Sequence, residues 1–353
     1  MGEIMVVVKL RKSFFQIFLI ILSLIFMFKM PNAVTVGVTK GLQICFSVIL
    51  PSLFPFMVLS TYIIKSNIFS FAYKFISPVS RILFRQPAST IPVIIMSLIG
   101  GFPVGIKMVG NLLRDGKISE NQAQRLCFFC MNGGPAFIIT AVGVNMLGST
   151  KAGVIMFVSL CISSLIMGFF TRFLGDKSEL KTQVETQSTM SSVSSAVSDA
   201  LQSVLGVCAW VVIFSAITNC LEMCIENKSI FITVSSILEV TNGCVMLAGK
   251  MPIPVITAVI GFGGICVHCQ VLSELKECKV KYSHFFVCRV FNGAIASFIS
   301  YLLLLAFPVE IDVFASAQNM TVTAFSVSLP AFCTFAIMCI IMIFDIDRKK
   351  KIW

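Results

Sequence analysis

The chain has 353 residues, of which 57% are hydrophobic and only 12% are charged, and its mean hydropathy is +0.95. Soluble globular domains carry about 25% charged residues, so this composition excludes an ordinary soluble fold. The formal net charge is +11, but the basic residues stand between apolar segments and form no aromatic-interleaved face, which argues against nucleic-acid binding.

Long apolar runs without Asp, Glu, Lys or Arg define the class of protein. They are residues 86–106, 126–150, 152–171, 200–221, 251–273, 290–309 and 313–344, with further candidates at 13–28 and 41–64 and beside Lys74 and Glu239. A helix needs about 20 residues to cross a bilayer. We therefore predict an all-α, polytopic transmembrane helical protein with about nine to eleven embedded segments.

The first of these segments follows a basic N-terminus. Residues 29–32 offer no convincing small-residue cleavage site, which favours a first transmembrane helix over a cleaved signal peptide. We predict that residues 1–40 comprise an N-terminal cytoplasmic segment and this helix.

Two glycine-rich interruptions mark residues 41–174, which we predict to be a first repeat. Their residues are Gly100, Gly101, Phe102, Pro103 and Gly105, then Asn132, Gly133, Gly134 and Pro135. Proline removes a helical hydrogen bond and glycine permits unusual backbone geometry, so both sites predict broken or re-entrant helices. Backbone groups freed there could face a solute, whereas a kink or close helix packing is the alternative. The asparagine amide likewise contacts either a solute or a neighbouring helix.

Residues 175–199 are rich in Ser, Thr, Gln and Glu and have few bulky apolar side chains. Such a stretch cannot bury enough surface to fold alone, so we predict a polar flexible linker. It separates the first repeat from a second one at residues 200–309.

The second repeat contains a carboxylate inside an apolar segment. Glu239 is followed closely by Thr241 and Asn242, and the three side chains could bind a cation, a proton or a polar solute. An intramembrane carboxylate usually faces a cavity or a partner. Pairing with Lys228, Lys250 or water at the interface is the alternative.

The second repeat continues with Gly261, Gly263 and Gly264, and then with Asn292 and Gly293. Gly261 and Asn292 stand 160 positions after Gly101 and Asn132, respectively. Glycine-rich interruptions at corresponding places in two halves point to a binding site in a transporter. We therefore predict four breaks, with Asn292 as a further substrate-binding residue.

Basic residues predict the topology. Those of the N-terminus, of residues 107–125, of residues 276–289 and of the tail at 348–351 all indicate cytoplasmic loops. Residues 310–353 are then a last transmembrane helix with a cytoplasmic tail. Single crossings of every run between these loops would place residues 276–289 outside, so at least one segment must be re-entrant over a cavity.

Two Cys-x-x-C pairs, Cys127 with Cys130 and Cys266 with Cys269, lie in or beside apolar segments. There cysteine packs as a small hydrophobe, so we predict no metal, although His268 keeps a metal site open. Motifs of nucleophilic hydrolases, zinc proteases and phosphate loops are not found in the sequence, and we predict no cofactor and no enzyme activity.

Three segments carry a family resemblance: residues 51–56 (PSLFPF), residues 100–107 (GGFPVGIK) and residues 132–138 (NGGPAFI). They resemble the sporulation integral membrane proteins of the YlbJ type, in which an asparagine is usual where Met131 stands. The resemblance implies nucleoside-recognition (Gate) domains, distantly like those of spore maturation proteins and concentrative nucleoside transporters. It also implies a role in endospore formation, usually cortex assembly, and inverted repeats, although the charge count puts the basic loops that follow both breaks on one side.

The sequence thus predicts a transporter-like protein in a membrane of the sporulating cell that binds or moves a small polar solute, such as a nucleoside-like molecule. Its predicted partners are the lipid bilayer and that solute, with a homo-oligomer left open. The alternatives are a non-transporting scaffold that recruits sporulation machinery through the linker, and an enzyme built on Glu239 with His268 or His284.

Overall fold

A computed structural model describes residues 28–65, 80–174, 193–275 and 281–309, together with Ile21 and Pro78. Within these ranges all regular structure is helical, which confirms the all-α prediction. The α-helices are α2 (Pro31–Ile44), α3 (Leu50–Lys65), α5 (Ile91–Ile99), α6 (Phe102–Arg114), α7 (Glu120–Phe129), α8 (Thr150–Thr171), α9 (Val193–Cys224), α10 (Lys228–Leu238), α11 (Val240–Leu247), α12 (Ile253–Phe262), α13 (Gly264–Glu274) and α14 (Tyr282–Ala306). The π-helical turns are η1 (Cys45–Ile49), η2 (Ser80–Phe84) and η4 (Ala136–Met146), and the 3₁₀ turns are η3 (Ala88–Thr90) and η5 (Arg172–Leu174).

Five stretches of the described chain are long and apolar enough to cross a membrane: Pro31–Ile49, Thr150–Leu174, Val193–Cys224, Ile253–Ser273 and Tyr282–Ala306. Three shorter apolar helices, Ala88–Ile99, Ala136–Met146 and Lys228–Leu238, accompany them. The chain is therefore a multi-pass membrane protein. The segments predicted at residues 13–28 and 313–344 lie wholly or almost wholly outside the described residues.

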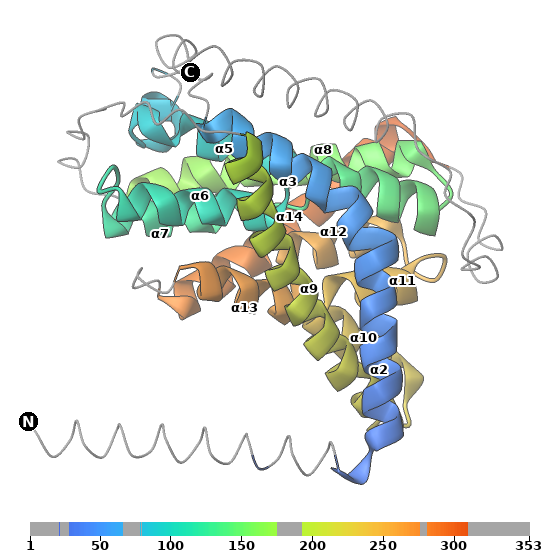
Figure 1. Cartoon of the computed structure of the whole chain (residues 1–353). Helices are drawn as coiled ribbons and strands as arrows, with labels where there is room; N and C mark the ends of the chain where they lie inside the picture. Colours follow the sequence, from blue (N-terminus) through green and yellow to red (C-terminus); the bar gives the residue numbers. More distant parts are fainter. Residues whose placement is uncertain are drawn as a thin grey trace, which may run out of the picture.

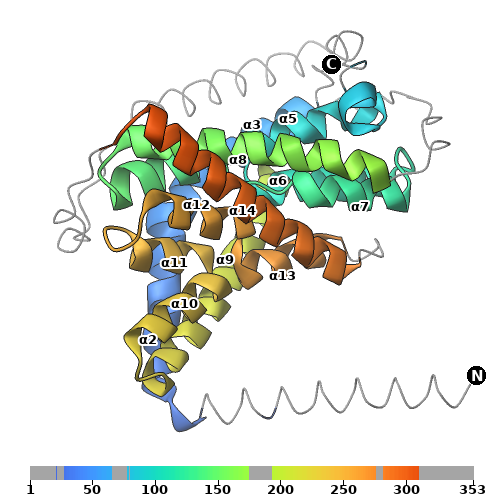
Figure 2. The same ribbon diagram turned by 180° about the vertical axis from the view of Figure 1, so that it is seen from behind.

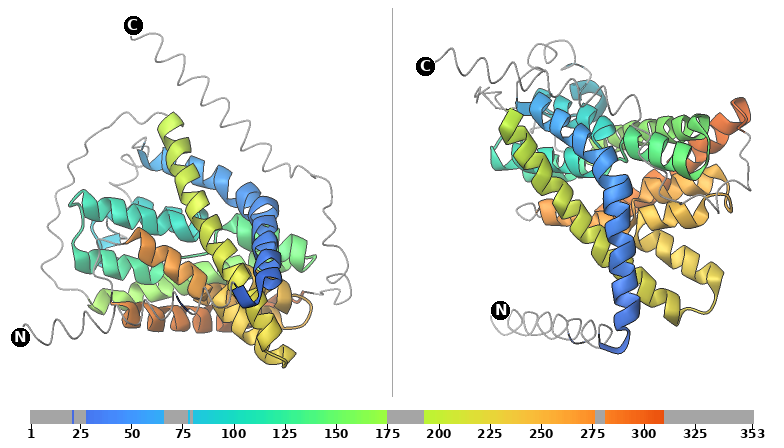
Figure 3. Two further views of the ribbon diagram at one scale, coloured as in Figure 1. Left: turned by 60° about the horizontal axis from the view of Figure 1, so that its bottom comes forward. Right: turned by 45° about the vertical axis from the view of Figure 1, so that its right-hand side comes forward.

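Helices α2 and α9 run side by side and, together with α10, extend away from the part of the molecule that holds α6, α7, α8 and α14 (Figures 1 and 2). Figure 3 shows the same pairing from two further sides. A Cβ placed on Gly37 would lie 2.6 Å from the Cα of Ala216, and one on Gly41 would lie 2.8 Å from the Cα of Val212. The missing side chains, one helical turn apart, let the two backbones touch.

Among the described residues, four helices are interrupted. Gly100 and Gly101 separate α5 from α6, residues 130–134 separate α7 from η4, Glu239 separates α10 from α11, and Gly263 separates α12 from α13. Three of these breaks were predicted from glycine and proline. The fourth predicted break, at Asn292 and Gly293, is wrong, because α14 continues through both residues. The fourth interruption in the structure lies at Glu239 instead.

Two interrupted helices followed by one long helix occur twice in the chain. The first set is α5–α6, α7–η4 and α8, and the second set is α10–α11, α12–α13 and α14. In this order the counterpart of the Gly100–Gly101 break is Glu239, whereas the 160-residue spacing pairs Gly101 with Gly261, near the end of α12. The 160-residue spacing therefore pairs the first interruption of the first set with the second interruption of the second set. The repeat boundaries at 41–174 and 200–309 stay a prediction.

The predicted polar linker is partly helical. Helix α9 begins at Val193, so the last residues of the predicted linker belong to it, and residues 175–192 lie outside the described residues.

The two predicted basic loops, residues 107–125 and 276–289, extend into helices at their C-terminal ends. Arg125 lies in α7 and Arg289 lies in α14, and both side chains are buried, which is incompatible with a place in a cytoplasmic loop.

Candidate functional site

The two interruptions of the first set lie against each other through their glycines. A Cβ on Gly134 would lie 3.1 Å from the nitrogen of Gly101, and one on Gly101 would lie 3.3 Å from the nitrogen of Gly134. Gly101 has φ 85° and ψ −178°, a conformation that is essentially restricted to glycine. Only residues without side chains can form this crossing.

The interruptions of the second set join the same place. A Cβ on Gly263, whose φ is 90°, would lie 3.3 Å from Met131 Cε and 3.7 Å from Phe102 Cε1. One on Gly264 would lie 3.1 Å from the nitrogen of Val240 and 3.5 Å from the Cα of Glu239. All four interruptions thus meet in one region of the molecule.

Arg289 ties this region together. Its side chain is fully buried in α14 and donates from Nη1 to the carbonyl of Met131 at 2.7 Å. It also donates from Nη2 to the carbonyl of Gly261 and from Nε to that of Phe262, at 3.3 Å for the latter. Carbonyls at helix ends have no partner within their own helix, and the planar guanidinium supplies donors in several directions at once. No carboxylate pairs with Arg289 in the part of the chain that the structure describes.

Glu239 is also buried, but it serves the backbone. Its Oε1 accepts from the Thr241 N–H at 2.9 Å and its Oε2 accepts from the Asn242 N–H at 2.6 Å. The carboxylate therefore caps the start of α11, where the helix dipole favours a negative charge. Lys228 and Lys250 are exposed, and no ion pair between them and Glu239 occurs among the described residues.

Both predicted asparagines are buried and are held by adjacent serines of α8. Asn132 Oδ1 accepts from Ser164 Oγ, and its Nδ2 donates to the Phe129 carbonyl at 3.1 Å. Asn292 Oδ1 accepts from Ser163 Oγ at 2.8 Å. Nδ2 of Asn292 donates to the carbonyl of Gly261 at 3.2 Å, so Asn292 and Arg289 share that acceptor.

The remaining predicted residues are glycines and prolines that lie within or beside the interruptions and helix crossings. Close approach explains Gly105 and Gly261, whose Cβ atoms would lie 2.3 Å from the Cys130 carbonyl oxygen and 2.7 Å from the Cα of Gly293, respectively. Pro103 lies in the first turn of α6, and Pro135 precedes η4. Buried Gly100 and Gly133 stand within the first-set interruptions.

The other polar side chains near the interruptions have protein partners. Asn242 Nδ2 donates to Ser215 Oγ of α9 at 3.2 Å, while Thr241 is buried. His268 Nε2 lies 3.0 Å from the Phe262 carbonyl, and the ring packs among aromatic rings that include Phe285. Lys107 Nζ donates to the carbonyl of Asp199 and to Ser203 Oγ, both on α9.

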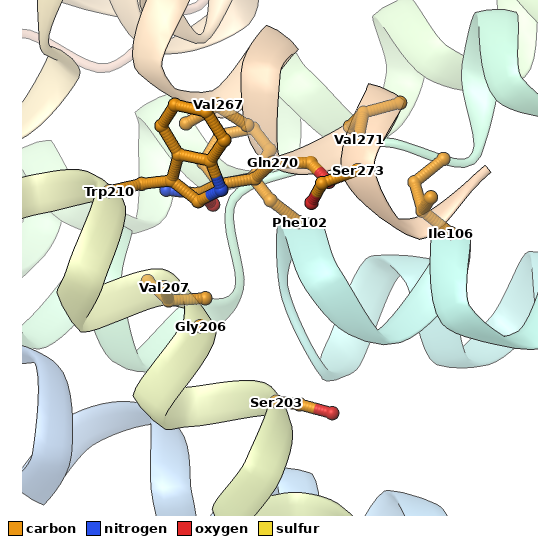
Figure 4. A pocket seen from close by; sticks show the side chains of 10 residues that line it. All are labelled: Phe102, Ile106, Ser203, Gly206, Val207, Trp210, Val267, Gln270, Val271 and Ser273. Atoms are coloured by element: carbon orange, nitrogen blue, oxygen red, sulfur yellow. The ribbon is translucent and has the colours of Figure 1, made fainter. Parts of the chain in front are cut away.

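A small open cleft of about 20 Å³ lies between α6, α9 and α13 (Figure 4). It is lined by Phe102, Ile106, Ser203, Gly206, Val207, Trp210, Val267, Gln270, Val271 and Ser273. Of the predicted site residues only Phe102 lines it. Trp210 and Gln270 were missed, because neither interrupts a helix or carries a charge. The signal that could have found them is the placement of tryptophan and glutamine inside apolar runs.

Within the described ranges, no three His, Cys, Asp or Glu side chains lie close enough together to hold a metal ion. The described cysteines are free thiols.

Comparisons with known proteins give one similarity. The chain is 24% identical over 318 aligned residues to the sporulation integral membrane protein YlbJ of Bacillus subtilis (strain 168), and the alignment covers 77% of this chain and 78% of the relative. No family model matches the chain. No solved structure matches it at a significant level.

Proposed function

We propose that this multi-pass membrane protein acts in endospore formation and binds or moves a small polar solute. The sporulation role is supported by the similarity to the Bacillus subtilis protein, whose name states a sporulation function. The family resemblance adds cortex assembly as the process, Gate-like repeats as the architecture and a nucleoside-like molecule as the solute.

The meeting of four helix interruptions beside one cleft carries the solute-binding part of the proposal. Non-helical backbone inside a membrane protein is tolerated where protein or a water-filled cavity covers it, and carriers place such breaks at their binding sites. Gly263 closely approaches Met131 and Phe102, and Phe102 lines the cleft. The geometry therefore supports a carrier more than a scaffold, for which the interruptions would have no use.

Two measurements test the two parts of the proposal. A Bacillus subtilis strain that lacks its YlbJ should regain heat-resistant spores when it expresses this chain. Proteoliposomes that contain the purified protein should take up radiolabelled uridine, a nucleoside, faster than empty liposomes.

The scaffold alternative predicts a different pattern of results. Spore formation would be restored without any uptake, and deleting residues 175–192 would abolish the restoration. A carrier largely keeps its function after that deletion, because the polar composition of these residues predicts a flexible linker.

A further inference from the structure

We propose that the cleft between α6, α9 and α13 binds a small uncharged molecule that combines a flat apolar face with a hydrogen-bonding amide edge. This inference rests on the proposed function, since it names the place and chemical class of the solute. It moves the site away from the asparagines and Glu239, which are held by protein groups.

Three helices each turn one face toward the cleft. On α9 the lining residues are Ser203, Gly206, Val207 and Trp210, at intervals of three and four residues, which place them on one side of the helix. They extend over about two helical turns, or roughly 10 Å, the length of a small ring compound with a substituent. Helix α13 contributes a similar stripe through Val267, Gln270 and Val271, as Figure 4 shows.

The lining contains no charged side chain. Its surface is formed mostly by valine, isoleucine, phenylalanine and tryptophan, which favour an apolar or aromatic face of a ligand. Transfer of an unpaired ion into such surroundings is costly. The nearest named charge, the ammonium of Lys107, is already bound to the carbonyl of Asp199 and to Ser203 Oγ.

Two polar groups of the lining are open to a ligand. The indole N–H of Trp210 has no hydrogen-bond acceptor among the described side chains and backbone groups. Gln270 uses one amide hydrogen for a 3.5 Å contact to Cys266 Sγ, and no donor in the described segments reaches its amide oxygen. A ligand with both an acceptor and a donor, such as an amide, would satisfy Trp210 and Gln270 together.

The walls of the cleft are connected to the interruptions. Phe102 is the first residue of α6 after the Gly100–Gly101 break, and α13 begins directly after the Gly263 break. A ligand held between them would contact two of the four interrupted helices. The cleft is also open at Gly206, where an added Cβ would meet no atom within 4 Å.

Fluorescence of Trp210 gives a direct test, because the chain has only two tryptophans, Trp210 and Trp353. The full-length Trp353→Phe protein in lipid nanodiscs would be titrated with benzamide, benzoate and benzylammonium. These probes share a ring and differ in charge. We expect a saturable change with benzamide and at least about tenfold weaker responses with the two ions. Equal responses to all three, or none to benzamide, would overturn the proposal.

Variants locate the response. Gly206→Leu places a side chain in the open part of the cleft and should abolish the benzamide response, whereas Ala209→Leu, exposed on the same helix outside the lining, should leave it unchanged. Gln270→Leu keeps the side-chain size and should weaken binding about tenfold. Unchanged melting temperatures would show that each variant folds. An unaltered response in Gly206→Leu, or one that follows lipid chain length and not the probe, would refute the site.

Failure of this inference is distinguishable from failure of the proposed function. Uptake of uridine that persists in Gly206→Leu would refute the cleft and keep the carrier. Benzamide binding at Trp210 without uptake of uridine would keep the cleft and refute the proposed transport of a nucleoside-like solute.

Discussion

The two sets of interrupted helices meet in one region but solve the problem of a broken helix differently. In the first set, the Gly101 and Gly134 backbones lie directly against each other, and the contact depends on the absence of side chains. In the second set, the start of α11 and the end of α12 are satisfied by charged groups, the carboxylate of Glu239 and the guanidinium of Arg289, respectively. The first set depends on the absence of side chains, and the second set depends on charged side chains.

The difference shows why one kind of helix interruption is harder to predict from the sequence than the other. A glycine and proline interruption is visible because few other functions explain those residues together. A break that a buried carboxylate caps looks like an isolated polar residue in an apolar run. The two kinds of break should therefore respond to different substitutions.

The largest expected effect is that of Arg289→Met. It removes the donor shared by the Met131, Gly261 and Phe262 carbonyls, which belong to both sets. Hydrogen bonds from a charged group contribute about 1.5–3 kcal/mol each, so the loss of three of them should lower the unfolding free energy by about 3 kcal/mol or more. Denaturation of the purified protein in detergent measures it.

Arg289→Lys and His284→Ala are the controls for that prediction. Lysine keeps the charge but lacks the planar fork, so it should recover only part of the loss. His284 is exposed on the same helix, and its removal should change stability little. A melting temperature of Arg289→Met equal to that of His284→Ala would contradict the proposed tie between the sets.

The next largest effect is that of Gly101→Ala. The φ of 85° and ψ of −178° place Gly101 in a region that other residues avoid, at a cost of about 1–3 kcal/mol. The new Cβ would also meet the Gly134 nitrogen at 3.3 Å. Thermal unfolding should show a clear loss of stability.

Gly148→Ala is the matched comparison for Gly101→Ala. Gly148 has φ 66°, but nothing lies within 4 Å of an added Cβ, so it carries backbone strain without crowding. Its loss should be smaller, about 1 kcal/mol. Equal losses in the two variants would mean that contact between the first-set breaks contributes nothing.

Glu239→Gln should have a moderate effect. Glutamine keeps one acceptor for the Thr241 and Asn242 N–H groups but loses the other and the charge, and loss of a helix cap costs about 0.5–2 kcal/mol. If Glu239 is only a cap, uptake by the folded variant stays at the wild-type rate. Lost uptake at an unchanged melting temperature would instead assign the carboxylate to the solute.

The smallest expected effect is that of Ser164→Ala, which removes one hydrogen bond to Asn132. Hydrogen bonds between membrane helices contribute about 0.6 kcal/mol on average. The Ser163 Oγ lies 2.8 Å from both the backbone oxygen and Oδ1 of Asn292, so its single hydrogen is shared between two acceptors and Ser163→Ala should cost slightly more. Unfolding curves that reverse this order would show that the second acceptor adds no stability.

Composition and charge-free runs were sufficient to predict the class of protein, and glycine and proline motifs predicted three of the four interruptions. They failed at Asn292 and Gly293, because an asparagine followed by glycine breaks a helix only when no neighbour satisfies the amide. Here the amide group bonds to Ser163 and to the Gly261 carbonyl, and Gly293 provides room for Gly261 on α12. Asn292 and Gly293 therefore form a close contact between α14 and α12 and do not interrupt α14.

The candidate site was less predictable, since its residues come together only in the fold. Charge counting placed Arg289 in a loop because nothing local distinguishes a buried arginine from one at a membrane surface. Its partners are carbonyls, which every residue carries. Trp210 and Gln270 lie on different helices, and their common cleft follows from packing of α9 against α13.

Adjacent serines on α8 have a consequence for motion. Ser163 and Ser164 are separated by about 1.5 Å along the helix axis and by roughly a quarter of a turn around it, and each bonds a different asparagine. A slide or rotation of α8 by a single residue would bring Ser164 to the former position of Ser163 and leave one asparagine without its partner. Both hydrogen bonds form together in one register of α8, and a shift by one residue would break at least one of them.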